Sequence, residues 1–263
     1  MKSKILLTCF GLIAFSFLHG SIIITNGLSH TFSVESGKNY SGKINIKNGG
    51  ATFQSVELKK TDLATLSNGT YFFSDTINHI RSNRNWIIIN PTEITINPDQ
   101  SASINFEVHV PSDITLKGSY WSAIMVEPIN LIGSAATETG IRIQTITRYA
   151  IQIICNFGNS GIGQLKFQNP GLVKEKGKPF FDFIMLNTGE HIISPIVSME
   201  LFDSETGTSV KVLKAFKKAI YPTLSKKFSF PLEGISTSKS YKAVIIADGS
   251  GEDVFGMEYT VVL

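Results

Sequence analysis

The chain has 263 residues, of which 42% are hydrophobic and 17% are charged. This composition excludes an intrinsically disordered chain and is typical of a globular protein with one or two domains. The formal net charge is +3 and no basic stripe is visible, so nucleic acid is not an expected partner. Phe is frequent, with 18 copies, and β-branched residues recur in short runs.

The first 20 residues have the layout of an export signal. Lys2 and Lys4 precede an apolar run over residues 5–18, and the small residue Gly20 follows shortly after it. The run is too short for a membrane span, so we expect residues 1–20 to be a signal peptide. Its removal lowers Lys plus Arg from 24 to 22 against 21 Asp plus Glu, a net charge of +1. No later run approaches the ~20 apolar residues of a transmembrane helix, so no membrane span is expected in the mature chain.

The cysteine content limits which disulfides, metal sites and reactive thiols the chain can have. Of the two cysteines, Cys9 lies in the signal segment, so Cys155 is the single thiol expected in the mature chain. One thiol excludes an intramolecular disulfide and a zinc site built from cysteines. Because Cys155 stands in a long apolar run, we expect a small buried side chain here in preference to a reactive thiol.

Alternation of apolar and polar residues dominates the first half and predicts strands with one face in a core. The runs end at turn signals such as Asn48-Gly49-Gly50 and Pro111. The predicted strands lie at residues 22–34, 41–47, 53–58, 86–89, 93–96, 103–110 and 120–126.

Residues 141–155 form the longest uninterrupted run, without Gly or Pro. Typical strands have about five or six residues, so this segment predicts an unusually long strand, either straight or bent in its middle. Its odd-numbered positions are mostly apolar. Its even-numbered positions are mostly polar, as Arg142, Gln144, Arg148 and Gln152 show.

A segment rich in Gly and Asn at residues 156–163 is the best candidate for a domain boundary. Strands resume after it, and helical periodicity is weak, with at most one turn expected over residues 213–219. The predicted strands are 164–167, 180–186, 196–202, 226–230, 241–246 and 255–263. We therefore predict an all-β chain of two tandem immunoglobulin-like antiparallel β-sandwiches, at residues 21–157 and 158–263.

Several segments of both halves follow a shared pattern. The first-half segments are Ile94 to Ser101, Val110-Pro111 and Gly118 to Ile124. The second-half segments are Leu186 to Gly189, Pro195 to Val197, Leu201 to Asp203 and Ser240 to Ala243. In the first half these segments resemble PapD-like periplasmic chaperones, and in both halves they resemble more closely still the two-domain WxL-interacting proteins of bacterial cell surfaces. The resemblance covers roughly residues 22–263.

The resemblance implies a mechanism for residues 141–155. In PapD-like chaperones the last strand of the first domain pairs with an incomplete subunit and donates alternating apolar side chains to it, which is strand addition. The partner would be an exported or pilus-type subunit, and the compartment the periplasm. The residues assigned to the partner on this basis are Ile141, Arg142, Ile143, Gln144, Thr145, Arg148 and Tyr149.

The chain also departs from these patterns. Assembly chaperones hold the subunit's terminal carboxylate with a basic pair, one member on the first strand and one on the last. The first predicted strand, residues 22–34, has no Arg or Lys, whereas Arg148 is a candidate for the second member. WxL-interacting proteins usually carry a C-terminal membrane helix, and we expect none in this chain, whose last residues suit a strand.

Simpler interpretations stay open beside this one. Arg142 and Arg148 can be the solvent face of a strand, and Ile141 and Ile143 can fill the domain's own core. A secreted or cell-surface adhesion or ligand-binding protein is the alternative function, with contacts on loops such as residues 67–84. No catalytic motif, metal-ligand spacing or cofactor-binding motif is present, so an enzyme is the least favoured class.

Overall fold

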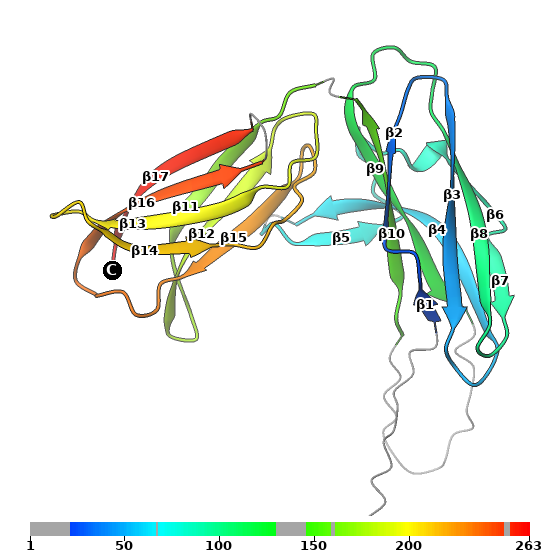
Figure 1. Cartoon of the computed structure of the whole chain (residues 1–263), viewed down its shortest axis with the longest axis horizontal. Helices are drawn as coiled ribbons and strands as arrows, with labels where there is room; N and C mark the ends of the chain where they lie inside the picture. The colour runs from blue at the N-terminus through cyan, green and yellow to red at the C-terminus, as the bar shows by residue number, and fades with distance from the viewer. Residues whose placement is uncertain (1–21, 67, 130–145, 159–160, 250–252) are drawn as a thin grey trace, which may run out of the picture.

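The computed structural model describes residues 22–66, 68–129, 146–158, 161–249 and 253–263. They form two β-sandwiches, with the strands of the second running across those of the first (Figure 1). The first sandwich contains β1 (Ile22–Ile24), β2 (Ser29–Ser33), β3 (Asn39–Asn48), β4 (Gln54–Thr65), β5 (Tyr71–Ser74), η1 (Arg84–Trp86), β6 (Ile87–Asn90), β7 (Glu93–Ile96), β8 (Ser101–His109), β9 (Gly118–Pro128) and β10 (Tyr149–Phe157). The second contains β11 (Leu165–Glu175), β12 (Lys178–Asn187), β13 (Ile196–Asp203), β14 (Ser209–Lys214), β15 (Ser225–Pro231), β16 (Ser240–Asp248) and β17 (Val254–Val262).

Two sheets face each other in the first sandwich. One has the order β1-β3-β8-β6, and the other has the order β2-β10-β9-β4-β5, with β7 also paired to β4. The inward positions of both sheets form one core that includes Ile44, Ile104, Phe106, Ile124 and Ile151, all at most 1% exposed. Alternation in the sequence therefore marks the core-facing side of each strand, as expected for a sheet with one face buried.

The second sandwich repeats the plan with a smaller sheet. Its sheets have the orders β11-β12-β15 and β14-β13-β16-β17. Their core is rich in aromatic rings, and Phe183 stacks on Phe228 and Phe230 with ring centroids 5.7 and 6.1 Å apart. The predicted fold class, two tandem immunoglobulin-like sandwiches, is confirmed.

The predicted first strand over residues 22–34 is in fact two strands in different sheets. β1 pairs with β3, whereas β2 pairs in parallel with β10 in the opposite sheet. Gly27 lies in the turn between them with a φ of +89°, a conformation that glycine adopts without strain. Alternation alone cannot reveal this change of sheet, because both strands keep an apolar inward face.

Other boundaries also differ from the sequence-based prediction. Strands β5 and β14 were not predicted, and residues 215–219 contain no helix. β4 extends to Thr65, well beyond the apolar run that predicted it, since its later residues pair with β5 and β9. Of the strand predicted throughout residues 141–155, residues 141–145 lie outside the described residues and 149–155 are confirmed as part of β10, whereas the prediction was wrong for residues 146–148, which are outside any strand.

No helix in the described residues has the length and apolar character needed to cross a bilayer.

Cys155 is fully buried in the first core, as the sequence predicted. Burial raises the pKa of its thiol to about 11, against an opposing hydrogen bond from Asn83 Nδ2 at 3.2 Å. The reactive thiolate is therefore scarce in the folded protein.

We expect Cys155, in the chain without residues 1–20, to resist a thiol reagent near pH ~8 while folded and to react fully in denaturant. Absorbance of the released chromophore measures the reaction, and the Cys155→Ala variant gives the background. Rapid labelling of the folded chain would contradict this burial.

Candidate functional site

β10 is the strand to which the sequence assigns partner binding. Its odd-numbered side chains, from Ile151 to Phe157, point into the first core and are at most 8% exposed. Its even-numbered side chains point to the opposite face of the sheet, toward the second sandwich. Burial of the odd positions fixes the register of the strand, since a slip of one residue would expose them all.

The two edges of β10 are covered to different extents. On one edge β9 pairs along the whole strand, from Tyr149 opposite Val126 to Phe157 opposite Gly118. On the other edge β2 pairs only with Gln152–Asn156. Within the part of the chain that the structure describes, residues 149–151 therefore have a strand on one edge alone. The expectation that a guest strand pairs along residues 141–155 is wrong for residues 152–155, which lie between two strands of the same sheet.

The direction of the backbone groups at this open edge follows from their neighbours. The amide of Gln152 donates to the carbonyl of Leu28 at 2.9 Å, and the amide of Val34 donates to the carbonyl of Asn156 at 2.8 Å. Even-numbered residues of β10 thus direct their backbone groups toward β2. By the same alternation Ala150 directs its N–H and C=O outward, one step beyond the point where β2 begins.

The structure describes only two of the residues predicted to bind a partner, Arg148 and Tyr149. Ile141, Arg142, Ile143, Gln144 and Thr145 lie outside the described residues. Arg148 is exposed and precedes β10. Tyr149 starts the strand, packs against the first core and donates its hydroxyl to the carbonyl of Ile22 at 2.7 Å. Its side chain therefore ties β10 to β1, and only its backbone lies at the open edge.

A row of charged side chains crosses the outward face of the sheet, from β4 over β9 to the residue that precedes β10. Lys59 Nζ lies 2.9 Å from Glu57 Oε2 and 3.8 Å from Glu127 Oε2, and Arg148 Nε lies 3.4 Å from Glu127 Oε1. These pairs are exposed, so solvent screens them strongly. Arg148 already faces a carboxylate of its own chain, so a guest carboxylate would compete with Glu127.

The strand beside β10 supplies no second cation. β2 consists of Ser29, His30, Thr31, Phe32 and Ser33. The rings of His30 and Phe32 contact the ring of core residue Phe106, with centroids 5.3 and 6.1 Å away. The basic pair of the assembly chaperones therefore has no counterpart across β2 and β10.

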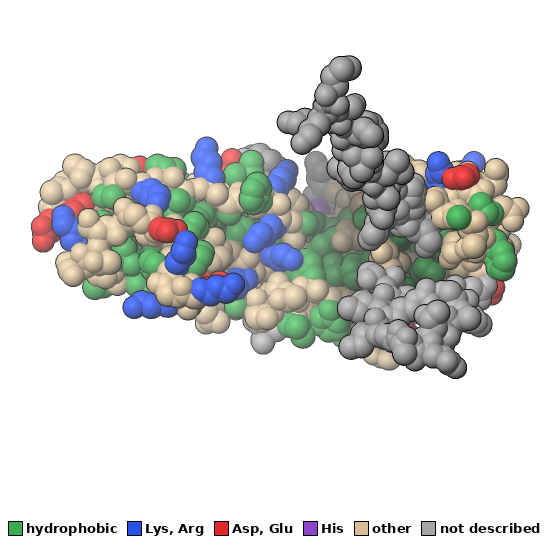
Figure 2. Space-filling view, turned by 90° about the horizontal axis from the view of Figure 1, so that it is seen from below, with side chains coloured by type: hydrophobic (Ala, Val, Ile, Leu, Met, Phe, Trp, Pro, Cys, Tyr) green, Lys and Arg blue, Asp and Glu red, His purple; other side chains and the backbone are tan. Residues whose placement is uncertain are grey.

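The two sandwiches meet through a small apolar cluster. It consists of Leu63 and Trp121 from the first sandwich and Tyr221 and Leu224 from the second, each at most 8% exposed. The ring centroids of Trp121 and Tyr221 are 5.1 Å apart. Figure 2 shows hydrophobic side chains gathered in the recess between the sandwiches.

Polar contacts fix the same interface. The hydroxyl of Tyr221 donates to Gln152 Oε1 at 2.6 Å, so a residue on the outward face of β10 is held by the second sandwich. Burial raises the pKa of Tyr221 to about 12, which keeps this hydroxyl a donor. The hydroxyl of Tyr71 likewise reaches the carbonyl of Ala219 at 3.1 Å.

Glu190 of the second sandwich contacts the first sandwich at the beginning of β9. Its carbonyl accepts from the amide of Ser119 at 2.7 Å, and its carboxylate lies 3.0 Å from Lys117 Nζ and 3.6 Å from Arg81 Nη2. The hydrogen bond from Lys117 is the main cause that lowers the pKa of Glu190. Gly118 has a φ of +73°, and a side chain there would collide with the backbone of Glu190.

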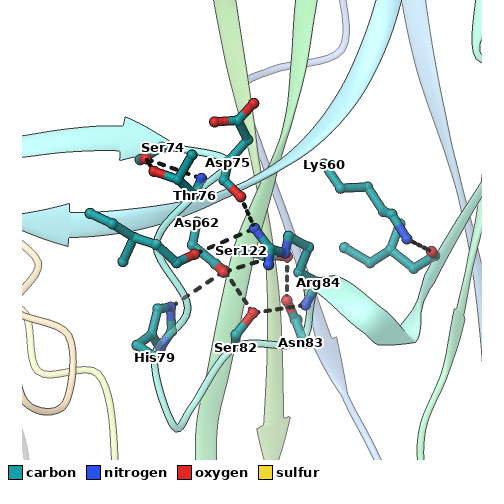
Figure 3. A network of polar contacts seen from close by, with 12 residues as sticks. Lys60, Asp62, Ser74, Asp75, Thr76, His79, Ser82, Asn83, Arg84 and Ser122 are labelled. Atoms are coloured by element: carbon teal, nitrogen blue, oxygen red, sulfur yellow. Dashed lines mark hydrogen bonds and ion pairs between the residues drawn. The ribbon is translucent and has the colours of Figure 1, made fainter.

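A buried polar network anchors the loop that follows β5 (Figure 3). Asp62 of β4 is fully buried. It accepts from Ser82 Oγ at 2.6 Å and lies 3.5 Å from both Arg84 Nε and His79 Nε2. The ring of His79 stacks on Trp121, with centroids 4.5 Å apart. Because Ser82 donates to the carboxylate and not to the imidazole, the network lacks the nucleophile–base contact of a serine hydrolase.

The sequence analysis missed the residues of the interface. Trp121 lay in a predicted strand, but nothing in the sequence paired it with Tyr221, Tyr71 or His79. These residues belong to distant strands and loops, and no spacing rule links them. In the described residues no cluster of three His, Cys, Asp or Glu side chains is placed to hold a metal ion.

Comparisons with known proteins bear on the fold. No family model and no curated protein sequence matches the chain. Among solved structures, the class 5 fimbriae chaperone CfaA is 16% identical with a TM-score of 0.47, covering 92% of this chain and 99% of that chain. The E. coli chaperone DraB is 12% identical with a TM-score of 0.46, covering 92% of this chain and 96% of that chain.

A chain of the CsuC–CsuE chaperone–tip subunit pre-assembly complex from Acinetobacter baumannii is 12% identical, with a TM-score of 0.46, over 90% of this chain and 97% of that chain. The PapD-like and WxL-interacting resemblances of the sequence both stay predictions. At such identities and TM-scores, function has to be argued from the geometry of the chain itself.

We expect Tyr221→Phe and Gln152→Leu to show non-additive losses of unfolding free energy. The coupling should be about 1 kcal/mol, because they share one part-buried hydrogen bond. Urea unfolding of the two single variants and the double variant measures it. As a control, Tyr241→Phe, whose hydroxyl bonds Ser236 within the second sandwich, should be additive with Gln152→Leu. Equal additivity in both cycles would mean that the contact does not couple the sandwiches.

His79 gives the stability a pH dependence of defined sign. Burial lowers its pKa more than Asp62 raises it, and the charge of Arg84 lowers it further. The unfolded chain therefore takes up this proton at a higher pH than the folded chain does. The stability from neutral His79 is present above about pH 6.5 and is lost as the pH falls toward the lowered value.

We expect His79→Gln to make the fall in unfolding free energy below about pH 7 shallower than in the wild type. Urea unfolding at a series of pH values measures the slope. His109→Gln serves as a control, since the His109 side chain is 42% exposed. An unchanged slope in His79→Gln would contradict the assignment.

Proposed function

We propose that this chain is an exported, non-enzymatic protein-binding module that receives an extended segment of another exported polypeptide at the open edge of β10. The periplasm is the compartment we favour, and chaperone-like capture of a secreted or pilus-type subunit is the role. The observation that carries the proposal is the point at which β2 stops pairing with β10, between Ala150 and Gln152.

The physical basis is an incomplete sheet edge on a rigid support. Ala150 has outward backbone groups, and its neighbours Tyr149 and Ile151 are held by β9 and by the core. A guest strand entering here would form backbone hydrogen bonds without reorganising the sheet. Long exposed edges invite aggregation, so an edge of this kind is usually covered unless binding makes use of it.

The proposal also uses the second sandwich. Tyr221 and the apolar cluster hold that domain against the outward face of β9 and β10. The recess beside the edge is therefore preformed, which reduces the conformational entropy lost on binding. An ion pair between a guest carboxylate and Arg148 is not required, because backbone hydrogen bonds supply the affinity.

Two other functions have weaker support. For a surface adhesion or ligand-binding protein, residues 67–84 would carry the contacts, and Ile80 there is 86% exposed. Much of that loop is nevertheless held by Asp62 in the buried network. For an enzyme, a hollow of about 730 Å³ on the second sandwich is lined by Lys242 and Glu258, which pair with each other at 2.8 Å. That hollow offers no nucleophile–base pair among its lining residues.

We expect Ala150→Pro to abolish guest capture while the chain stays folded. Proline removes the outward N–H that a guest strand would use, and edge positions tolerate it because no internal hydrogen bond is lost. A photo-crosslinking residue at exposed Arg148, in the full chain in producing cells, should capture an extended segment of another exported polypeptide. Mass spectrometry identifies that segment.

Ala150→Val is the matched control, because it keeps the N–H and suits a strand. It should capture the same segment at the wild-type level, and thermal unfolding should show both variants folded. Capture that persists in Ala150→Pro, or crosslinks only to this chain itself, would contradict the proposal.

A further inference from the structure

A group of lysines lies on the second sandwich where it approaches the first. Lys214, Lys217 and Lys218 lie on the end of β14 and the segment that follows it, and Lys226 lies on β15. We call these four residues the lysine cluster. Lys218 Nζ donates to the carbonyl of Lys227 at 3.1 Å, which joins the two segments.

No carboxylate of the described residues lies within ion-pair distance of the lysine cluster. By contrast, Lys227, Lys239 and Lys242 of the same sandwich each have a carboxylate within 4 Å. Burial lowers the pKa of Lys218, and burial followed by the charge of Lys218 lowers that of Lys226. The four ammonium groups therefore form a concentration of positive charge that the protein itself does not neutralise.

Aromatic rings hold part of the cluster in place. Lys226 Nζ lies 3.6 Å from the ring centroid of Tyr71, which belongs to the first sandwich, and Lys218 Nζ lies 4.9 Å from that of Phe228. Phe216, between Lys214 and Lys217, is 90% exposed. An exposed Phe among cations is a combination that favours contact with a partner.

The position of the cluster limits the class of partner that fits it. Through Tyr71 it borders the recess between the sandwiches, and Figure 2 shows lysines of the second sandwich beside the hydrophobic floor of that recess. A flat bilayer cannot follow a concave surface, whereas an extended polypeptide can. Charge complementarity then requires that this polypeptide be acidic.

We propose that the lysine cluster and Phe216 bind an acidic segment of the guest polypeptide, on the second sandwich and apart from the open edge of β10. This inference rests on the proposed function and adds a chemical requirement to it. A guest would be recognised twice, by backbone pairing at β10 and by carboxylates at the cluster, and the charge would also accelerate encounter.

Poly-L-glutamate labelled with a fluorophore is a direct probe of the cluster. We expect the full chain without its signal segment to bind it at low salt, with an affinity that falls steeply as salt is added. Lys214→Glu with Lys217→Glu should weaken binding at least about tenfold, since two attractive contacts become repulsive. Fluorescence anisotropy gives the dissociation constants.

Lys43→Glu with Lys47→Glu is the matched control, because both lysines are exposed on β3 and the net charge changes equally. It should weaken binding less than about twofold. Equal losses in the two double variants would overturn the proposal, since net charge alone would then explain binding. Binding to phosphatidylglycerol vesicles with none to poly-L-glutamate would overturn it as well.

A second experiment tests the lysine cluster independently of the open edge of β10. A photo-crosslinking residue at Phe216 should capture the same guest as one at Arg148, through a segment rich in Asp and Glu. Capture of a neutral or basic segment at Phe216 would overturn the cluster proposal while leaving the β10 edge intact. Conversely, Ala150→Pro should leave poly-L-glutamate binding unchanged.

Discussion

The pairing of β2 with β10 determines how the first sandwich can be used. β2 joins the sheet in parallel at Gln152 and completes it as far as Asn156, while β1 has already left for the opposite sheet. The crossing depends on the turn at Gly27 and leaves the beginning of β10 with one neighbour among the described strands. Because backbone groups in a sheet must either pair or face solvent, this single crossing separates a sealed half of the edge from an accessible half.

The interface between the sandwiches lies next to that accessible half of the edge. Gln152 lies at the boundary of the two halves and accepts a hydrogen bond from Tyr221. Glu190 and Gly118 hold the junction at the opposite end of β9, where there is no room for a side chain. The apolar cluster is small, and polar contacts between the sandwiches lie on both sides of it.

Charge is distributed differently on the two sandwiches. Arg148, which precedes β10, and Lys59, which lies on β4 beyond β9, already share the carboxylate of Glu127. The lysine cluster has no such partner in the described residues. Carboxylates of a guest would therefore gain little binding free energy at the first sandwich and more at the second. Backbone pairing and charge recognition would then take place on separate surfaces.

The sequence by itself determined the fold class, the inward face of most strands and the burial of Cys155, because alternation and turn residues are local signals. It predicted a strand that β10 matches from Tyr149 onward, but the polarity of residues 146–157 does not reveal that β2 covers part of that strand. Only the tertiary structure decided the change of sheet at Gly27, the contact of Trp121 with Tyr221 and the isolation of the lysine cluster. These depend on residues far apart in the chain, and their proximity exists only once both sandwiches have packed.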